Sequence, residues 1–112
     1  MTECNRGDVV LVSFIFSDET GERRRPAVIV SSNTYHRNRQ EAIIAAVTSR
    51  TDRILMGDHL ISDWQGAGLI FPSVATGILR TVKQSMIAKK LGSMPAQDMQ
   101  MIDSKLKLVL GL

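Results

Sequence analysis

The sequence has very few of the residues that build metal centres and disulfide frameworks. It contains one cysteine, Cys4, and two histidines, His36 and His59, among 112 residues. A single cysteine cannot form an internal disulfide, and ligands this few and this far apart give no zinc-binding spacing. We therefore expect neither a metal nor a cofactor.

Long apolar runs and the signature loops of common enzyme classes are also missing. No run approaches the roughly 18 apolar residues of a membrane span, and the polar start MTECNRGD is unlike a secretory signal. We therefore expect a cytoplasmic protein. The chain has no GxxxxGK[ST], GxGxxG, HExxH or GxSxG motif. Phosphate-loop, dinucleotide-binding, zinc-protease and hydrolase-elbow classes thus have no support.

The composition is that of a small globular protein with an aliphatic core. Hydrophobic residues make up 44% and aromatic residues only 4%, which fits a single domain over residues 1–112. The formal charge is +3 and the pI is near 9.4, a mild excess that suits a polyanionic partner. The arginines gather in one stretch and flank its apolar runs: Arg23, Arg24, Arg25, Arg37, Arg39, Arg50 and Arg53.

Short β-rich runs alternate with polar segments along most of the chain. Strands are predicted at 9–16, 26–31, 42–48, within 53–62 and 69–83, and 86–91 is either a strand or a helical turn. Residues 17–24 are predicted to form a loop around Gly21, and Ser32 or Asn33 can cap one helical turn within 32–40. Strands this short, mostly joined by tight loops, favour a small antiparallel barrel.

The C-terminal segment has the pattern of a helix over about 95–110. Met99, Ile102, Leu106 and Val109 recur at spacings of three and four residues, which puts them on one helical face. Pro95 suits a first turn, Asp98 adds favourable charge near that end, and Gly111 suits a helix stop. The predicted fold is therefore mainly β and closes with one helix.

Arginine and hydroxyl chemistry is what the sequence offers for a site. Arg25 precedes Pro26, which biases it toward an extended conformation at the predicted strand entrance. A guanidinium held there can fork onto two phosphate oxygens, or it can be a solvated loop arginine. Thr48 and Ser49 end the third predicted strand, where hydroxyls either bind a phosphate or cap a turn. If the second and third strands pair antiparallel, Arg25 and Thr48 meet at one sheet edge.

Several segments together resemble the MazF/PemK toxins of bacterial toxin–antitoxin pairs. They are RGDVVLVSF (6–14), GERRRPAVIVSS (21–32), SNTYHRN (32–38), AIIAAVTS (42–49), AGLIFPSV (67–74), LRTV (79–82) and KKLGSMP (89–95). The resemblance implies an SH3-like or CcdB-like barrel with a C-terminal helix, usually as a homodimer. It further implies metal-independent, sequence-specific cleavage of single-stranded mRNA to 2′,3′-cyclic phosphate and 5′-hydroxyl ends. The implied partner is a cognate acidic antitoxin.

The resemblance also assigns roles to individual residues. Arg25 matches the family's catalytic arginine before proline, and Thr48 matches its strand-end hydroxyl. Some members carry an acidic base in the loop before that arginine; here Glu19 or Glu22 accepts the 2′-OH proton, with Glu19 preferred, or both pair with nearby arginines. The predicted RNA-binding residues are Arg23, Arg24, Ser49, Arg50 and Thr76. Other members use an Arg-x-Asp pair in a later strand, which SVATGILRT (73–81) lacks.

Two other functions compete with the ribonuclease hypothesis. A CcdB-like gyrase inhibitor would share the fold without nuclease activity, but that group engages gyrase through a C-terminal Trp-Gly-Ile tail and this chain ends KLVLGL. A nucleic-acid-binding barrel without catalysis is the second alternative. Trp64 and Tyr35 are interpreted as structural residues in preference to base-stacking platforms. His36 is interpreted as a surface residue and not as the catalytic acid.

Overall fold

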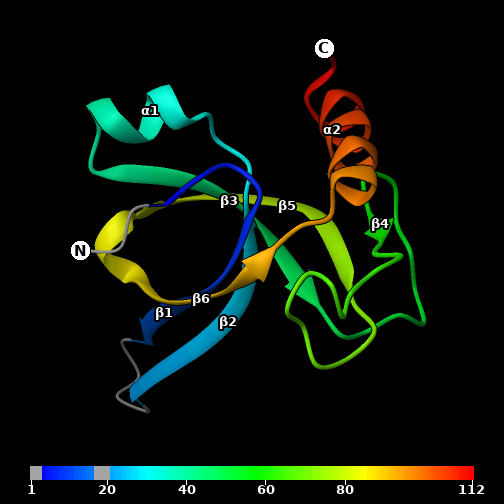
Figure 1. Cartoon of the computed structure of the whole chain (residues 1–112), viewed down its shortest axis with the longest axis horizontal. Coiled ribbons are helices and arrows are strands. Elements are labelled where there is room, and N and C mark those ends of the chain that lie inside the picture. The colour runs from blue at the N-terminus through cyan, green and yellow to red at the C-terminus, as the bar shows by residue number, and fades with distance from the viewer. Residues whose placement is uncertain (1–3, 17–20) are drawn as a thin grey trace.

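A strongly curved antiparallel sheet with two helices forms the molecule (Figure 1). The computed structural model describes residues 4–16 and 21–112. The strands are β1 (Asp8–Phe16), β2 (Gly21–Ile29), β3 (Glu41–Thr48), β4 (His59–Leu60), β5 (Val74–Lys83) and β6 (Ile87–Ser93). The helices are α1 (Asn33–Asn38), the 3-10 turn η1 (Gln84–Met86) and α2 (Ala96–Leu110).

The strand order places β2 and β3 in the middle of the sheet. It runs β4-β5-β3-β2-β1-β6, and neighbouring strands pair antiparallel throughout the described sheet. β1 lies between β2 and β6, and two register shifts interrupt its ladder with β6. Such irregularities bend a strand and increase its twist. The predicted class, mainly β with a C-terminal helix, is confirmed. The sheet is curved, and within the described residues no hydrogen-bonded ladder joins β4 to β6.

Each face of the sheet has its own hydrophobic core. Val9, Val28, Ala45 and Val47 point to the face covered by α2, where they meet Ile102 and the segment before β5. The residues between them point the other way and form a second cluster: Cys4, Val10, Val12, Ala27, Ile29, Ala42, Ile44 and Val82. Alternation along the strands therefore assigns the core residues of β1, β2 and β3 to one face or the other.

Two sequence-based boundaries are wrong. Residues 21–24 are not loop: β2 begins at Gly21, which pairs with Phe16, so the arginines lie within a strand. An exposed strand end accepts charged side chains, which is why apolar patterning missed it. The strand predicted within 53–62 is only His59–Leu60, because Gly57 has a positive φ of 92° and turns the chain beforehand.

The ends of the two helices follow their sequence signals. Ser32 is the N-cap of α1 and its side chain accepts a hydrogen bond from the Tyr35 N–H. α2 stops at Gly111, whose φ of 73° allows its N–H to bond the last carbonyls of the helix. Within residues 4–16 and 21–112, neither helix combines the length and the apolar character that crossing a membrane would require.

Candidate functional site

The pairing between β2 and β3 stops just before a proline. Its register is Ala27↔Ala46, Val28↔Ala45 and Ile29↔Ile44, and β2 continues toward the hairpin as Pro26 and Arg25. Proline has no N–H to donate to a ladder, which accounts for the end of the pairing at this point. Continued by two residues, the same register sets Arg25 opposite Thr48. The two residues singled out in the sequence thus border one opening in the sheet.

A cavity of about 380 Å³ lies at this opening. Its walls come from β1, β2, β3 and β6 and from the segment before β5: Leu11, Arg25, Pro26, Val47, Thr48, Ser49, Gly68, Leu69, Ile70, Phe71, Ser73 and Leu91. Ile70 and Phe71 are largely exposed, so the cavity has an apolar rim beside its polar residues. The cavity therefore combines Arg25, Thr48 and Ser49, as the antiparallel pairing predicted.

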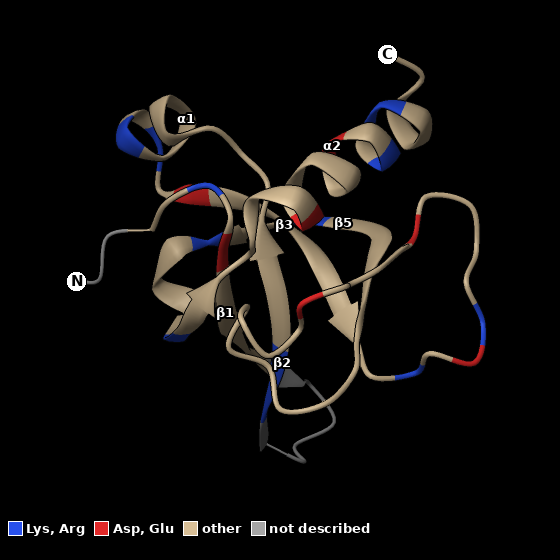
Figure 2. Ribbon diagram, turned by 45° about the vertical axis from the view of Figure 1, so that its right-hand side comes forward, with Lys and Arg blue, Asp and Glu red and all other residues tan. Residues whose placement is uncertain are grey.

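Basic residues lie on the part of β2 that runs toward the hairpin (Figure 2). Arg25 is an exposed cation in the middle of β2, and not at the strand entrance as predicted. Arg25 pairs with Val12 of β1. Its side chain therefore lies on the same face of the sheet as Val12, and the neighbouring Pro26 faces the other way. Among the residues that the structure describes, Arg25 has no carboxylate or hydrogen-bond partner. An exposed guanidinium without an internal partner, carried on a strand whose backbone is paired, is suited to binding an anionic ligand.

Thr48 presents its hydroxyl group on the same face as Arg25. Ala45 and Val47 belong to the core under α2, so alternation turns Thr48 to the other side. Its Oγ1 accepts the Arg50 N–H at 3.2 Å. That bond fixes the oxygen and leaves the hydroxyl hydrogen available to donate to a ligand oxygen. The predicted alternatives, turn capping and ligand binding, are therefore compatible in this residue.

Thr76 and Arg50 line a second cavity of about 460 Å³, which Thr48 also borders. Thr76 Oγ1 donates to the Ala46 carbonyl at 2.7 Å and accepts the Ile78 N–H, so its hydroxyl holds the irregular part of the β3–β5 ladder. Arg50 is exposed and pairs weakly with Asp52 at 3.5 Å. The structure thus places these two predicted RNA-binding residues beside Thr48 but outside the cavity that Arg25 lines.

Two of the remaining predicted residues, Arg23 and Arg24, lie on β2. Arg23 and Arg24 are exposed and pair with Phe14 and Ser13, so their side chains leave opposite faces of the strand. Only Arg23 shares a face with Arg25. Glu19 lies outside the described residues. The assignment of Glu19 as a base and of Arg23 and Arg24 as RNA-binding residues stays a prediction.

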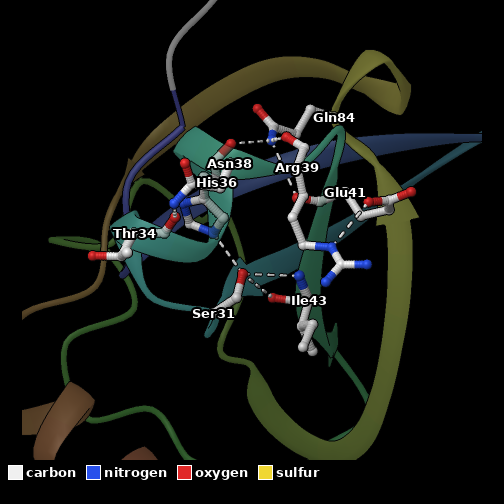
Figure 3. Close-up of polar contacts among 8 residues, drawn as sticks. All are labelled: Ser31, Thr34, His36, Asn38, Arg39, Glu41, Ile43 and Gln84. Carbon is white, nitrogen blue, oxygen red and sulfur yellow. Dashed lines mark hydrogen bonds and ion pairs between the residues drawn. The ribbon is translucent and has the colours of Figure 1, made fainter.

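At the other end of β2, a compact polar network holds α1 against the sheet (Figure 3). The side-chain amide of Gln84 donates to the carbonyl oxygens of His36, Arg39 and Glu41 at 3.0–3.1 Å. Ser31 Oγ accepts the Ile43 N–H at 2.9 Å. Gln84 therefore links the end of α1 to the start of β3, and its amide N–H groups are engaged in hydrogen bonds within the fold.

His36 is buried, with 7% of its surface exposed, so its interpretation as a surface residue is wrong. Its Nε2 contacts Ser31 Oγ within the same network. Burial lowers the pKa of His36 by more than a hydrogen bond with the Cys4 backbone and the nearby Asp8 carboxylate raise it. The ring is therefore neutral at physiological pH and serves as a packing residue. A cavity of about 570 Å³ beside it is lined by Arg37, Arg39 and Lys83 but by no residue of the Arg25 site.

Comparison with known families accounts for nearly the whole chain. Residues 5–110 match the sequence model of the PemK-like, MazF-like toxins of type II toxin–antitoxin systems. The chain belongs to this family. Comparison of the sequence with curated proteins gave no significant match.

Solved structures of MazF proteins and of endoribonucleases share the fold at low sequence identity. A MazE–MazF complex from Deinococcus radiodurans has a TM-score of 0.82 at 22% identity, covering 100% of this chain and 99% of the other. An endoribonuclease from a mycobacterial species has a TM-score of 0.78 at 20% identity, covering 100% and 95%. An endoribonuclease in complex with its cognate antitoxin, also mycobacterial, has a TM-score of 0.77 at 21% identity, covering 97% and 96%. The family assignment favours the toxin hypothesis over the gyrase-inhibitor and inactive-barrel alternatives.

In this PemK/MazF-like toxin, a buried carboxylate holds the segment between β4 and β5. That segment includes Ile70 and Phe71, which form the apolar rim of the cavity that Arg25 lines. Asp98, in the first turn of α2, is 2% exposed and accepts hydrogen bonds from His59 Nε2 at 2.8 Å and from the Ser62 and Asp63 N–H groups. Burial alone would raise the pKa of Asp98, but these hydrogen bonds hold it below its ordinary value. Trp64 packs on the core from the same segment, as its structural interpretation predicted. The sequence indicated only the helix-end charge of Asp98.

The sequence did not reveal one feature of the sheet face that carries Arg23 and Arg25. Arg80 Cζ lies 4.6 Å from the centre of the Phe14 ring, although these residues belong to β5 and β1. The strands are not neighbours in the sheet, so only its curvature brings the two side chains together. No local pattern in the sequence encodes such a contact.

Within the described part of the chain, no cluster of three or more histidine, cysteine or acidic residues could hold a metal.

Proposed function

We propose that this toxin is a sequence-specific, metal-independent endoribonuclease that cleaves single-stranded mRNA. The observation that carries the proposal is the position of Arg25 and Thr48 on either side of the opening beyond Pro26, on one sheet face. A cation and a hydroxyl donor that are not committed to internal partners can hold the phosphate of an RNA strand. The named endoribonucleases among the solved structures share this fold and support the same activity.

The reaction needs no activated water, because RNA carries its own nucleophile. The 2′-oxygen beside the scissile phosphate attacks phosphorus, and the bond between phosphorus and the 5′-oxygen breaks. The 2′-OH proton passes to a base, and the 5′-oxygen takes up a proton as it leaves. The products are a 2′,3′-cyclic phosphate and a 5′-hydroxyl. The protein's task is to align the attack and to stabilise charge on the pentavalent phosphorus.

Each residue of the site has a distinct role in this proposal. Arg25 neutralises the equatorial phosphate oxygens, or donates a proton to the leaving 5′-oxygen, and Thr48 donates a hydrogen bond to one phosphate oxygen. Glu19 remains the proposed base. Ser49 lies beside Thr48 in the same cavity and contacts the strand there. Arg50 and Thr76 border the neighbouring cavity and contact the RNA beyond it.

A single assay tests the activity. Purified full-length protein is incubated with a long RNA in EDTA, and the ends of the fragments are mapped. We expect cleavage at one short recognition sequence that leaves cyclic phosphate and 5′-hydroxyl ends. Absence of cleavage, or cleavage that Arg25→Ala leaves unchanged, would contradict the proposal. An Arg37→Ala variant is the matched control, because Arg37 lies on α1 and bonds only Thr34 among the described residues.

We further propose that the toxin acts in the cytoplasm as a homodimer and is inhibited by an acidic antitoxin. Exposed apolar side chains near the second cavity support association with a second copy: Ile54, Leu55, Met56 and Ile78. Exposed arginines on β2 support binding of an acidic segment. Light scattering after size exclusion should give twice the monomer mass of 12.4 kDa. A monomer at all concentrations would refute the dimer.

A further inference from the structure

The cavity beside α1 is lined by cations and neutral polar groups, and no carboxylate lines it among the described residues. Its volume is about 570 Å³, within the range of about 300–1,000 Å³ that is usual for small-molecule sites. The side chains that it gathers come from four separate segments: Asn5 before β1, Arg39 between α1 and β3, Lys83 at the end of β5, and Ser85 in η1. Tertiary packing thus brings positive charge and hydrogen-bonding groups to one cavity far from Arg25.

The buried floor and the exposed rim of this cavity differ in what their polar groups already bond. On the floor, Gln84 and His36 belong to the network that holds α1, so they gain little from a ligand. On the rim, the ammonium group of Lys83 has no partner among the described residues. The side chains of Asn5 and Ser85 are also exposed and have no described bond. Binding of a ligand therefore falls to the rim.

Arg39 is held in place at the same rim. Its Nε donates to the Glu41 carboxylate at 3.5 Å (Figure 3), and its Cζ lies 5.2 Å from the centre of the Tyr35 ring. The two terminal amino groups of Arg39 have no partner among the described residues. These groups can fork onto two oxygens of an anion. The two contacts also reduce the freedom that the side chain would lose on binding.

The charges and amides of the rim together match the chemistry of a nucleotide. Lys83 and Arg39 bring two positive charges, and a phosphate monoester carries a charge of about −1.5 to −2 near pH 7. The cavity has room for a larger body beside the phosphate. The side-chain amide of Asn5 offers a donor and an acceptor together, which is the pair that the N6 and N7 edge of adenine takes. A nucleoside monophosphate has both parts in one small molecule.

We propose that the cavity beside α1 binds an adenine nucleoside monophosphate, with Lys83 and Arg39 on its phosphate and Asn5 on its base. The cavity shares no lining residue with the one that holds Arg25 and Thr48, and the proposal goes beyond the ribonuclease function. A ligand that bridges separate segments binds only the folded chain, so it should stabilise the toxin against unfolding.

The test uses the full-length protein with AMP as the probe, and with adenosine and inorganic phosphate as its two fragments. Calorimetric titration gives Kd, and urea unfolding gives the midpoint with and without AMP. We expect AMP to raise the midpoint and to bind about tenfold more tightly than either fragment, because each fragment lacks one set of contacts. Lys83→Gln should weaken AMP binding about tenfold, as for loss of one charged hydrogen bond. Lys83→Arg keeps the charge and should retain most of the affinity.

Two control variants locate the bound AMP. Lys89→Gln removes an exposed charge from β6, outside the cavity, and should leave Kd unchanged. Arg25→Gln should also leave it unchanged, because Arg25 lines the other cavity. The proposal is overturned if AMP does not bind, if either fragment binds as tightly, if Lys83→Gln binds as the wild type does, or if either control weakens binding equally. RNA cleavage is assayed without AMP, so failure of the ribonuclease proposal is distinguishable from failure of this one.

Discussion

The two ends of β2 use their polar side chains in opposite ways. Toward α1, the amide of Gln84 donates to three backbone carbonyls, and Ser31 bonds both His36 and the Ile43 N–H. Toward the hairpin, Arg25 has no ion pair with any described residue, and Thr48 is known to accept only one hydrogen bond. Both ends border cavities, and the cavity beside α1 is the larger of the two.

This difference shows why cavity size is a poor guide to the site. A polar group that already has good internal partners gains little from a ligand, because binding would exchange one hydrogen bond for another. A group without an internal partner gives up only water when a ligand arrives, so no internal hydrogen bond is lost on binding. The α1 end is thus expected to govern stability, and the hairpin end is expected to govern activity. Each prediction below tests one side of this separation.

The largest effect is expected for Arg25→Ala. Removing a donor that stabilises transition-state charge typically lowers the rate by a factor of about 10²–10³. Arg25 is exposed and makes no described ion pair, so the free energy of unfolding should change by less than about 0.5 kcal/mol. Single-turnover cleavage and urea unfolding measure the two quantities. A large decrease in the free energy of unfolding would mean that Arg25 stabilises the fold, as the residues near α1 do.

Gln84→Leu should have the reverse profile. Leucine fills a similar volume but leaves the carbonyls of His36, Arg39 and Glu41 without their donor. We expect the free energy of unfolding to fall by about 2 kcal/mol, because partly buried acceptors lose their hydrogen bonds. Cleavage per folded molecule should be unchanged. Gln40→Leu is the matched control: Gln40 is exposed and has no described side-chain bond, so its effect on unfolding should be small.

Thr48→Val should lower the cleavage rate about fivefold, a smaller effect than the loss of Arg25. Valine keeps the branched shape and removes one neutral hydrogen bond to the phosphate, worth roughly 1 kcal/mol. Thr48→Ser keeps the hydroxyl and should retain most of the activity. An unchanged rate in Thr48→Val together with a loss in Thr48→Ser would show that the methyl group, and not the hydroxyl, matters at this position. The assay is the rate of cleavage of a saturating RNA substrate.

The sequence predicted the elements whose signals are local. The apolar runs gave β1 and β3, the Ser32 cap gave α1, and the spacing from Met99 to Val109 gave α2. Juxtaposing Arg25 and Thr48 required only antiparallel pairing of two strands joined by a short segment, so that part of the site was also predictable. The start of β2 was not, because its arginines carry no apolar alternation and the hairpin register alone makes them a strand.

What the sequence could not provide depends on curvature and burial. Arg80 meets Phe14 only because the sheet bends across two intervening strands. His36 is buried although its neighbours in SNTYHRN are mostly exposed, since α1 packs that one side chain toward Ser31. Asp98 meets His59 over a separation of 39 residues. These contacts follow from tertiary packing, which no periodicity of 2 or 3.6 residues encodes.

The smallest expected effect is a pH dependence of stability at the α1 end. The pKa of His36 is lowered by burial, so below the usual histidine pKa of about 6.5 the unfolded chain binds a proton that the folded chain does not. His36 should therefore contribute full stability above that pH and lose it as the pH falls through the folded value. Urea unfolding at pH 7.5 and 5.5 should show a decrease that is smaller in His36→Gln, with His59 common to both proteins. An equal decrease in the two proteins would assign the pH dependence to other groups and would remove His36 from the folding side of the comparison.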